Sequence, residues 1–236
     1  VMASGSLQRS MIAWATRPAW EHWTAAEAAA QDATVTAEID AIVKRIQPPA
    51  IPARDFDVRT FGAKGDGTTN CTAAITAAIA AAAKAGGGRV VVPAGRFLTG
   101  AIHLKSHVGL HLDKGATLAF SRDPRHYPIV FTRWEGVELM NYSALIYAFE
   151  QTDIAVTGEG TLDGQADAQN WWPWKGTSLG LNGPNASPAQ TVVAPSATNQ
   201  NAARTRLLDL GARGVPVAER VFGGGSYLRP NFIQPY

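Results

Sequence analysis

Carboxylates, histidines and tryptophans are the side chains of this sequence whose spacing could support chemistry. Asp163, in the run GEGTLDGQ, is followed four residues later by Asp167. Two neighbouring carboxyl groups could divide general-acid and general-base work between them. Asp163 is, however, followed directly by a glycine in a turn-like run, where aspartate commonly bonds the backbone of its own turn. The sequence therefore favours a structural role for Asp163.

Three histidines, His103, His107 and His111, recur at intervals of four, which on a helix would align three zinc ligands. The residues around them alternate between apolar and polar as strands do, so the three would not share a face. We therefore predict surface or stacked histidines and no metal site.

Four tryptophans form a second group: Trp134, Trp171, Trp172 and Trp174. Indole faces can stack on sugar rings, but tryptophan is also highly buried on average because of its area. Packing is the interpretation that we favour.

Composition excludes several classes of protein. The 236 residues are 46% hydrophobic and 17% charged, with a net charge of +2, which is enough for a folded core. Basic residues form no stripe, so nucleic-acid binding is not expected. No apolar run approaches the roughly 18 residues of a membrane span. The single cysteine, Cys71, has no internal disulfide partner, and its expected role is packing.

The elements that must position these side chains begin at Asp55. Phe56, Val58 and Phe61 predict a short strand, followed by glycine-rich turns and by Thr68-Thr69-Asn70, whose side-chain oxygens could cap a helix. The alanine-rich run 72–85 predicts that helix, with Ile75 and Ile79 on its heavier apolar face. A second helix is expected over Trp20–Ile46, and we assign residues 1–54 to an N-terminal helical segment and linker.

A repeat of strand pairs follows from Gly88. Val90-x-Val92, Leu110-x-Leu112 and Ile154-x-Val156 are each followed by a glycine and then, six positions after the second apolar residue, by a leucine: Leu98, Leu118 and Leu162. Short strands that repeat about every 20 residues are typical of solenoids. The fold class we predict is all-β, a right-handed single-stranded parallel β-helix over residues 55–236, with helix 72–85 capping its first coil.

Two stretches interrupt the repeat. Residues 123–143 are rich in aromatics and predict an excursion packed beside the coils, and residues 177–203 are rich in Ser, Thr, Asn and Pro and predict a long mobile loop. Residues 220–236 are again predicted to be structured.

Several motifs together resemble one family. DFDVRTFGAKGDGTTNCTAAI, GGGRVVVPAGRFLTGAIHLKS, FTRWEGVELMNYSALIYA, GEGTLDGQ, WWPWKG and YLRPNFIQPY are similar to segments of the family 28 glycoside hydrolases, the polygalacturonase-like pectin enzymes, and of their bacterial exo-acting branch in particular. The resemblance covers about Asp55–Tyr236 outside the loop. The opening motif occurs in other solenoids, and the combination of TRWEG, WWPWKG and LRPNFIQPY is the selective part.

The resemblance implies inverting hydrolysis of α-1,4-linked galacturonate, without a cofactor, by aspartates in NTD and DD motifs aided by GHG and RIK motifs. None of these motifs occurs in residues 1–236. In the family they follow the LRPNFIQPY segment, so we expect an N-terminal portion, truncated on the C-terminal side and inactive as a hydrolase by itself. No catalytic residue is assigned. The expected partner is pectin or an oligogalacturonide, and the expected location is secreted or periplasmic.

Five residues are our candidates for substrate contacts: Trp134, Glu135, Tyr142, Arg229 and Asn231. The planar guanidinium of Arg229 suits a galacturonate carboxylate, and Trp134, Glu135 and Tyr142 could belong to a loop that closes a cleft. Two alternatives stay open: a non-catalytic, tailspike-like glycan-binding β-helix, and a pectate-lyase-like enzyme, which would require clustered carboxylates for calcium.

Overall fold

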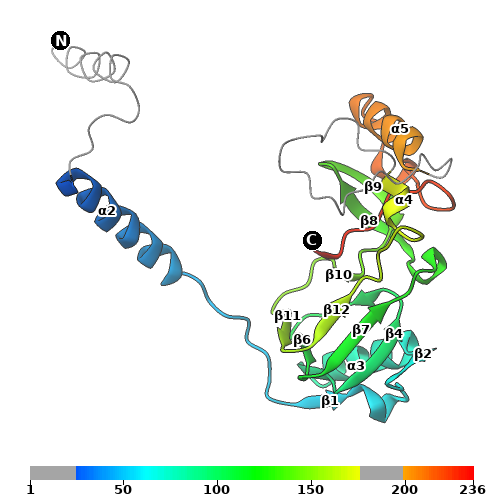
Figure 1. Ribbon diagram of the computed structural model, residues 1–236, viewed down its shortest axis with the longest axis horizontal. Helices are drawn as coiled ribbons and strands as arrows, with labels where there is room; N and C mark the ends of the chain where they lie inside the picture. Colours follow the sequence, from blue (N-terminus) through cyan, green and yellow to red (C-terminus); the bar gives the residue numbers. More distant parts are fainter. Residues whose placement is uncertain (1–24, 176–198) are drawn as a thin grey trace. The chain divides into compact units, whose positions relative to one another are not determined.

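The computed structural model describes residues 25–175 and 199–236 (Figure 1). The chain divides into two compact units, Val1–Pro48 and Pro49–Tyr236. The boundary lies six residues before the one that the sequence predicted, and the first residues of the second unit explain the difference. The backbone N–H of Ala50 donates to Asp153 Oδ1 at 3.0 Å, which ties this stretch to a coil.

In the first unit the structure describes one helix, α2 (Ala25–Val43). It lies within the helix predicted over Trp20–Ile46, whose first residues fall outside the described part of the chain. Val35, Ile39 and Ile42 recur at helical spacing, and each is about half exposed.

The second unit starts with β1 (Asp55–Asp57), the 3₁₀ helix η1 (Val58–Phe61) and β2 (Asp66–Asn70). The predicted strand through Val58 and Phe61 is therefore wrong beyond Asp57. The cause is local, because the Asp57 carboxylate accepts a hydrogen bond from the backbone N–H of Arg59 at 2.8 Å and caps the 3₁₀ turn.

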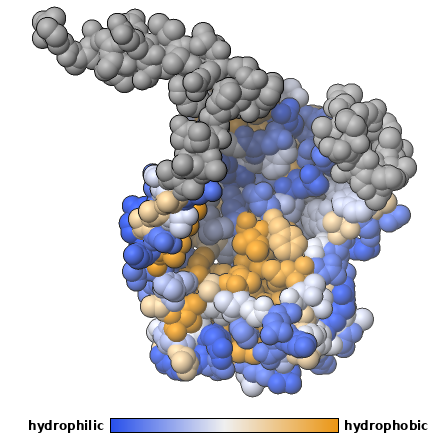
Figure 2. All heavy atoms as spheres, turned by 60° about the vertical axis from the view of Figure 1, so that its left-hand side comes forward, coloured by the Kyte–Doolittle hydropathy of each residue, from blue (hydrophilic) through white to orange (hydrophobic). Residues whose placement is uncertain are grey.

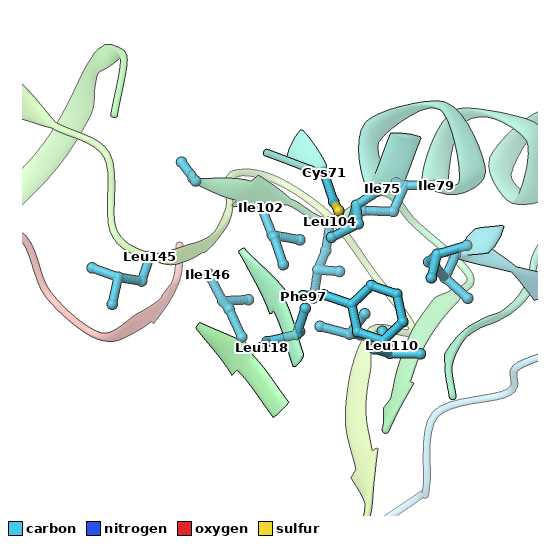
Figure 3. Packing of buried hydrophobic residues seen from close by; sticks show 14 of the residues in the cluster. Cys71, Ile75, Ile79, Phe97, Ile102, Leu104, Leu110, Leu118, Leu145 and Ile146 are labelled. Atoms are coloured by element: carbon cyan, nitrogen blue, oxygen red, sulfur yellow. The ribbon is translucent and has the colours of Figure 1, made fainter. Parts of the chain in front are cut away.

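Helix α3 (Thr72–Lys84) follows and packs against the first coils. The predicted capping holds only for Asn70, whose Oδ1 accepts from the backbone N–H of Thr72 at 2.9 Å. The N-cap residue itself is Cys71, which makes no side-chain capping bond, and Thr68 and Thr69 lie in β2. Ile75 and Ile79 are buried as expected, and Figure 3 shows them directed from the helix into the cluster that contains Leu104 and Phe97. Cys71 is also buried there as a free thiol.

Three parallel sheets make the coils. Sheet A has the strand order β1, β3 (Gly88–Val92), β6 (Val108–Leu112) and β11 (Ala155–Gly158). Sheet B has the order β12 (Thr161–Asp163), β7 (Ala116–Phe120), β4 (Gly95–Thr99) and β2. Sheet C has the order β13 (Ile233–Pro235), β10 (Ile146–Ala148) and β5 (Ile102–His103). Each successive coil adds one strand to each sheet, which is the organisation of a parallel β-helix.

The register differs in detail from the predicted one. Val92 pairs with Leu112 as expected, but Leu112 pairs with Gly158 and not with Val156. Phe97, and not Leu98, is the partner of Leu118. The repeat lengths therefore vary by one or two residues, and the turns between strands absorb the difference.

Both excursions leave the coils at the same corner, between sheet B and sheet C. The first, between β7 and β10, contains the 3₁₀ helix η2 (Pro124–His126) and an antiparallel hairpin of β8 (Ile129–Trp134) and β9 (Val137–Tyr142). The second, between β12 and β13, contains α4 (Trp172–Lys175), α5 (Asn201–Ala212) and the 3₁₀ helix η4 (Val217–Glu219). Because consecutive coils stack, the two excursions lie together (Figure 1).

The predicted loop 177–203 needs a correction at its end, because residues 201–203 form the first turn of α5. The rest of that loop up to residue 198 lies outside the described residues.

The core runs through the coils, with a second cluster under the excursions. Val90, Leu110 and Leu118 are fully buried in the coil interior. Leu139, Leu207, Phe222 and Leu228 form the second cluster between β9, α5 and the following segment. Figure 2 shows that one face of the molecule exposes a group of apolar residues bordered by polar ones.

Candidate functional site

The corner where the excursions leave the coils contains a pocket of about 590 Å³. Its walls come from β12 and the residues after it, from the tip of the β8–β9 hairpin, from the residue before β10, from the residue before α4, and from the segment that enters β13. The polar and aromatic lining residues are Trp134, Thr161, Asp163, Gln165, Trp171, Arg229, Asn231 and Phe232. Three of the five predicted contact residues, Trp134, Arg229 and Asn231, therefore meet in one pocket.

A two-residue turn places Trp134 at the pocket. Trp134 ends β8 and pairs with Val137 across the turn. Between them Glu135 and Gly136 have φ angles of 44° and 84°, the positive values that a tight type I′ hairpin turn requires. The indole also packs against the second core cluster, which fixes its side away from the pocket.

The segment Leu228–Phe232 forms a second wall. Its ends are anchored, since Leu228 is fully buried and the Phe232 ring meets Phe120 edge to face at 5.8 Å. Asn231 Nδ2 donates to the backbone oxygen of Arg133 at 3.2 Å and to Gln234 Oε1 at 3.0 Å, so this side chain joins the segment to the hairpin.

Arg229, between those anchors, is a cation without a counter-charge among the described residues. Its Nε is buried and has no hydrogen-bond partner there. Burial lowers the pKa of the guanidinium from its ordinary value, but arginine stays protonated in proteins. A desolvated guanidinium with an unused donor is costly for the fold. Because Arg229 lines the pocket, an anionic ligand there would compensate the charge of its guanidinium.

Asp163 is the carboxylate in the lining of the pocket. Its carboxylate accepts from Arg96 Nη2 at 2.9 Å and from the backbone N–H of Gln165 at 2.8 Å. Burial acts to raise the pKa of Asp163, but these hydrogen bonds and the charge of Arg96 outweigh it, and the pKa lies below its ordinary value. Asp163 thus holds its turn and ties β12 to β4, two coils apart.

The pH dependence of the stability of an Asp163→Asn variant tests the bond between Asp163 and Arg96. A carboxyl group whose pKa is lowered by folding stabilises the protein above its unfolded-state pKa, and this stabilisation is lost as the pH falls through the folded-state value. We expect Asp163→Asn to cost about 0.5–1 kcal/mol at pH 7, because the pair is partly exposed, and the difference from wild type to shrink as the pH falls through the lowered pKa of Asp163. Urea unfolding over a series of pH values from neutral to acidic measures it. Glu159→Gln, at an exposed carboxylate with no ion pair among the described residues, is the control, and an unchanged difference at low pH would contradict the assignment.

Trp171 closes the inner side of the pocket. It is 6% exposed, and its ring packs edge to face against Tyr127 at 5.7 Å and against Trp174 at 4.9 Å. Its indole Nε1 is buried without a hydrogen-bond partner among the described residues. Trp171 and Arg229 both line the pocket, and each therefore carries a buried donor without a partner among the described residues.

The remaining candidates lie elsewhere. Glu135 points to α5, where its Oε2 accepts from Arg204 Nε at 2.7 Å. Tyr142 is buried, and its ring lies 5.9 Å from that of Trp174. Asp167 pairs with Arg122 in a turn closed by Asn170. Trp172 is half exposed beside them.

The three histidines do not converge. The nearest polar partners are Ser143 Oγ for His103, Asp153 for His107 and Thr157 Oγ1 for His111. The described residues contain no group of three histidine, cysteine or acidic side chains that could hold a metal ion. They also contain no helix long and apolar enough to cross a membrane.

Taken together, the pocket is lined by two tryptophans, one cation without a counter-charge among the described residues, and one carboxylate. Indoles provide flat apolar surfaces for a ring, and a desolvated guanidinium recognises a carboxylate in a planar, bidentate manner. The arrangement suits a ring ligand that carries both hydroxyl groups and a carboxylate. Sequence reasoning singled out Asp163 and Trp171 but did not bring them to Arg229, because nothing local indicates that both excursions leave at one corner.

Comparison with known proteins places these features in context. Residues 56–113 match the family described as rhamnogalacturonase A/epimerase, pectate lyase-like. The chain is 36% identical over 121 residues to a probable polygalacturonase of Vitis vinifera, a match that covers 48% of this chain and 24% of that protein. It is 37% identical over 123 residues to an exo-poly-alpha-D-galacturonosidase of Dickeya chrysanthemi, covering 49% of this chain and 20% of that protein.

A solved structure extends the comparison to the fold. The hyperthermoactive exopolygalacturonase of Thermotoga maritima is 44% identical, with a TM-score of 0.74, over 84% of this chain and 42% of that one. The chain thus spans less than half the length of each of these relatives. The predicted right-handed parallel β-helix is confirmed.

Proposed function

We propose that this chain, which is similar to a probable polygalacturonase, an exo-poly-alpha-D-galacturonosidase and an exopolygalacturonase, is part of a pectin-degrading glycoside hydrolase that acts on galacturonate chains. The observation in this chain that supports the proposal is Arg229, which has no counter-charge among the described residues and lines one pocket with Trp134 and Trp171. A galacturonate unit offers the carboxylate that Arg229 lacks and a ring face for an indole.

Within this proposal the pocket residues have separate roles. Arg229 binds a carboxylate of the substrate, Trp134 contacts a sugar ring, and Asn231 holds the hairpin and the 229–232 segment together while facing the ligand. Glu135 and Tyr142 stay predictions as substrate contacts, since neither lines the pocket. A secreted or periplasmic location stays a prediction as well.

We further propose that residues 1–236 bind the substrate without cleaving it. The resemblance assigns acid and base catalysis to NTD and DD motifs, and this sequence contains neither. Inverting hydrolysis requires two carboxyl groups about 6.5–9.5 Å apart with a water between them. Asp163 and Asp167 are each bound in an arginine pair and a turn, which leaves them poorly suited to that task.

The test compares the intact chain with two glycans of equal length. Calorimetric titration with an oligogalacturonide is expected to show binding, whereas a neutral galacto-oligosaccharide is expected to show none. Incubation with polygalacturonate, followed by chromatography of the products, is expected to release no galacturonate. Release of galacturonate would refute the non-catalytic part of the proposal, and equal affinity for both glycans would refute the recognition of galacturonate.

A further inference from the structure

Helix α5 packs on the outside of the hairpin that carries Trp134. Leu207 of α5 is fully buried against Leu139 of β9, together with Phe222 and Leu228. Trp134 packs against the same cluster from the hairpin tip. One apolar contact region therefore joins α5, the hairpin, and the residue that precedes Arg229.

Polar and close-packed contacts fix α5 along the hairpin. Arg204 Nε donates to Glu135 Oε2 at 2.7 Å, directly beside Trp134. Further along the helix, a Cβ on Gly211 would lie 3.0 Å from Val137 Cγ1, so the backbone of α5 approaches β9 about as closely as it can. The helix is thus held at Glu135, in the turn, and at Val137, the first residue of β9.

The residue before α5 reaches the other indole wall. The backbone N–H of Gln200 donates to the backbone oxygen of Trp174 at 2.7 Å. The Trp174 ring lies 4.9 Å from that of Trp171, which lines the pocket. The start of α5 is therefore connected to Trp171, and its middle is connected to Trp134.

We propose that α5 positions the two tryptophan walls of the pocket, with Arg204 and Leu207 as positioning residues that touch no ligand. A two-stranded hairpin is only marginally stable without packing on one face, so Trp134 needs a support outside the pocket. The identity of the ligand, a galacturonate chain, rests on the proposed function. The connection between α5 and the two tryptophans does not depend on it.

The connection is tested on the whole chain labelled with 5-fluorotryptophan, with the Trp134 and Trp171 resonances assigned from Trp→Phe variants. Arg204→Gln removes the ion pair and is expected to shift and broaden the Trp134 resonance. Arg213→Gln is the matched control, because Arg213 also lies at α5 but its one ion pair among the described residues is with Asp209 of the same helix, at 3.0 Å. The double exchange Arg204→Glu with Glu135→Arg should restore the Trp134 resonance.

Leu207→Ala gives a second, larger perturbation. The amide protons of α5 are expected to exchange at least about tenfold faster, because the helix loses its buried anchor, and both indole resonances should move. The Kd for an oligogalacturonide should rise about twofold to fivefold in Arg204→Gln, in keeping with a partly exposed ion pair.

The two hypotheses fail in different ways. If neither Arg204→Gln nor Leu207→Ala moves the Trp134 resonance, the positioning role of α5 is refuted. If the resonances move as expected but the wild-type chain binds no oligogalacturonide, the positioning role stands and the proposed ligand is refuted.

Discussion

Replacing Arg229 with methionine is expected to weaken the binding of acidic oligosaccharides while leaving the protein as stable as wild type or more so. Loss of a charge-assisted contact to a carboxylate costs about 1.5–3 kcal/mol of binding free energy, or roughly a 10- to 150-fold rise in Kd. The affinity for a neutral oligosaccharide should not change, because no carboxylate is involved. Calorimetric titration of both glycans measures the difference.

The stability of the same variant separates a binding role from a structural one. In the unliganded protein Arg229 Nε is buried without a partner among the described residues, which costs about 1–3 kcal/mol where the group cannot be solvated. Methionine matches the arginine side chain as far as the position of Nε and has no hydrogen-bond donor, so the free energy of unfolding should rise by up to about 1 kcal/mol once the loss of partial solvation is allowed for. A structural arginine would show the opposite sign.

Arg213→Met provides the control, since that side chain is exposed at the end of α5 and, within the part of the chain that the structure describes, forms an ion pair with Asp209 alone. It should change neither binding nor stability beyond about 0.5 kcal/mol. A stability loss in Arg229→Met without any change in the affinity for acidic glycans would show that Arg229 serves the fold and not a ligand.

Gly158→Ala is expected to destabilise the coils severely. Gly158 ends β11 with a φ angle of 105° and pairs with Leu112 of the previous coil. A Cβ at this position would overlap the carbonyl oxygen of Leu112. That oxygen also accepts from the backbone N–H groups of Glu159 at 3.0 Å and Gly160 at 3.3 Å. We expect a loss of at least about 4 kcal/mol, in the range that only a disrupted core or backbone produces.

A Gly214→Ala variant separates the free-energy cost of a steric clash from the cost of placing alanine at a positive φ angle. Gly214 follows α5 with a φ angle of 66°, and a Cβ there would meet no atom within 4 Å. Only the conformational penalty remains, which is about 1 kcal/mol. Urea unfolding of the two variants should therefore differ by about 3 kcal/mol. Equal losses in the two variants would mean that a methyl group fits between the coils at Gly158.

The sequence predicted the coils well because their signal is periodic and local. Alternating apolar residues such as Val90 and Val92 indicate which side chains face the interior, and the alanine-rich run with Ile75 and Ile79 indicates the capping helix. The pairing of Leu112 with Gly158 was missed because a glycine has no side chain to mark its place in an apolar ladder.

The candidate site was predictable only in part, for a different reason. The family resemblance pointed to Trp134, Arg229 and Asn231, and these three do line one pocket. Helix α5 was not foreseen, because it buries a single residue, Leu207, and its run carries no apolar stripe of helical period. The Arg204–Glu135 pair joins residues 69 positions apart, and no local pattern reveals such a contact.

The stacking of the strands also bears on how this molecule loses its structure. Each strand of a sheet is bonded only to the strands of adjoining coils, as β6 is to β3 and β11, so free energy is shared mainly between nearest neighbours. The end covered by α3 and the end that forms the pocket can therefore unfold at different denaturant concentrations. A bound ligand would raise the denaturant concentration at which the pocket end unfolds and leave that of the α3 end unchanged. The shape of the unfolding curve therefore reports which end binds the ligand.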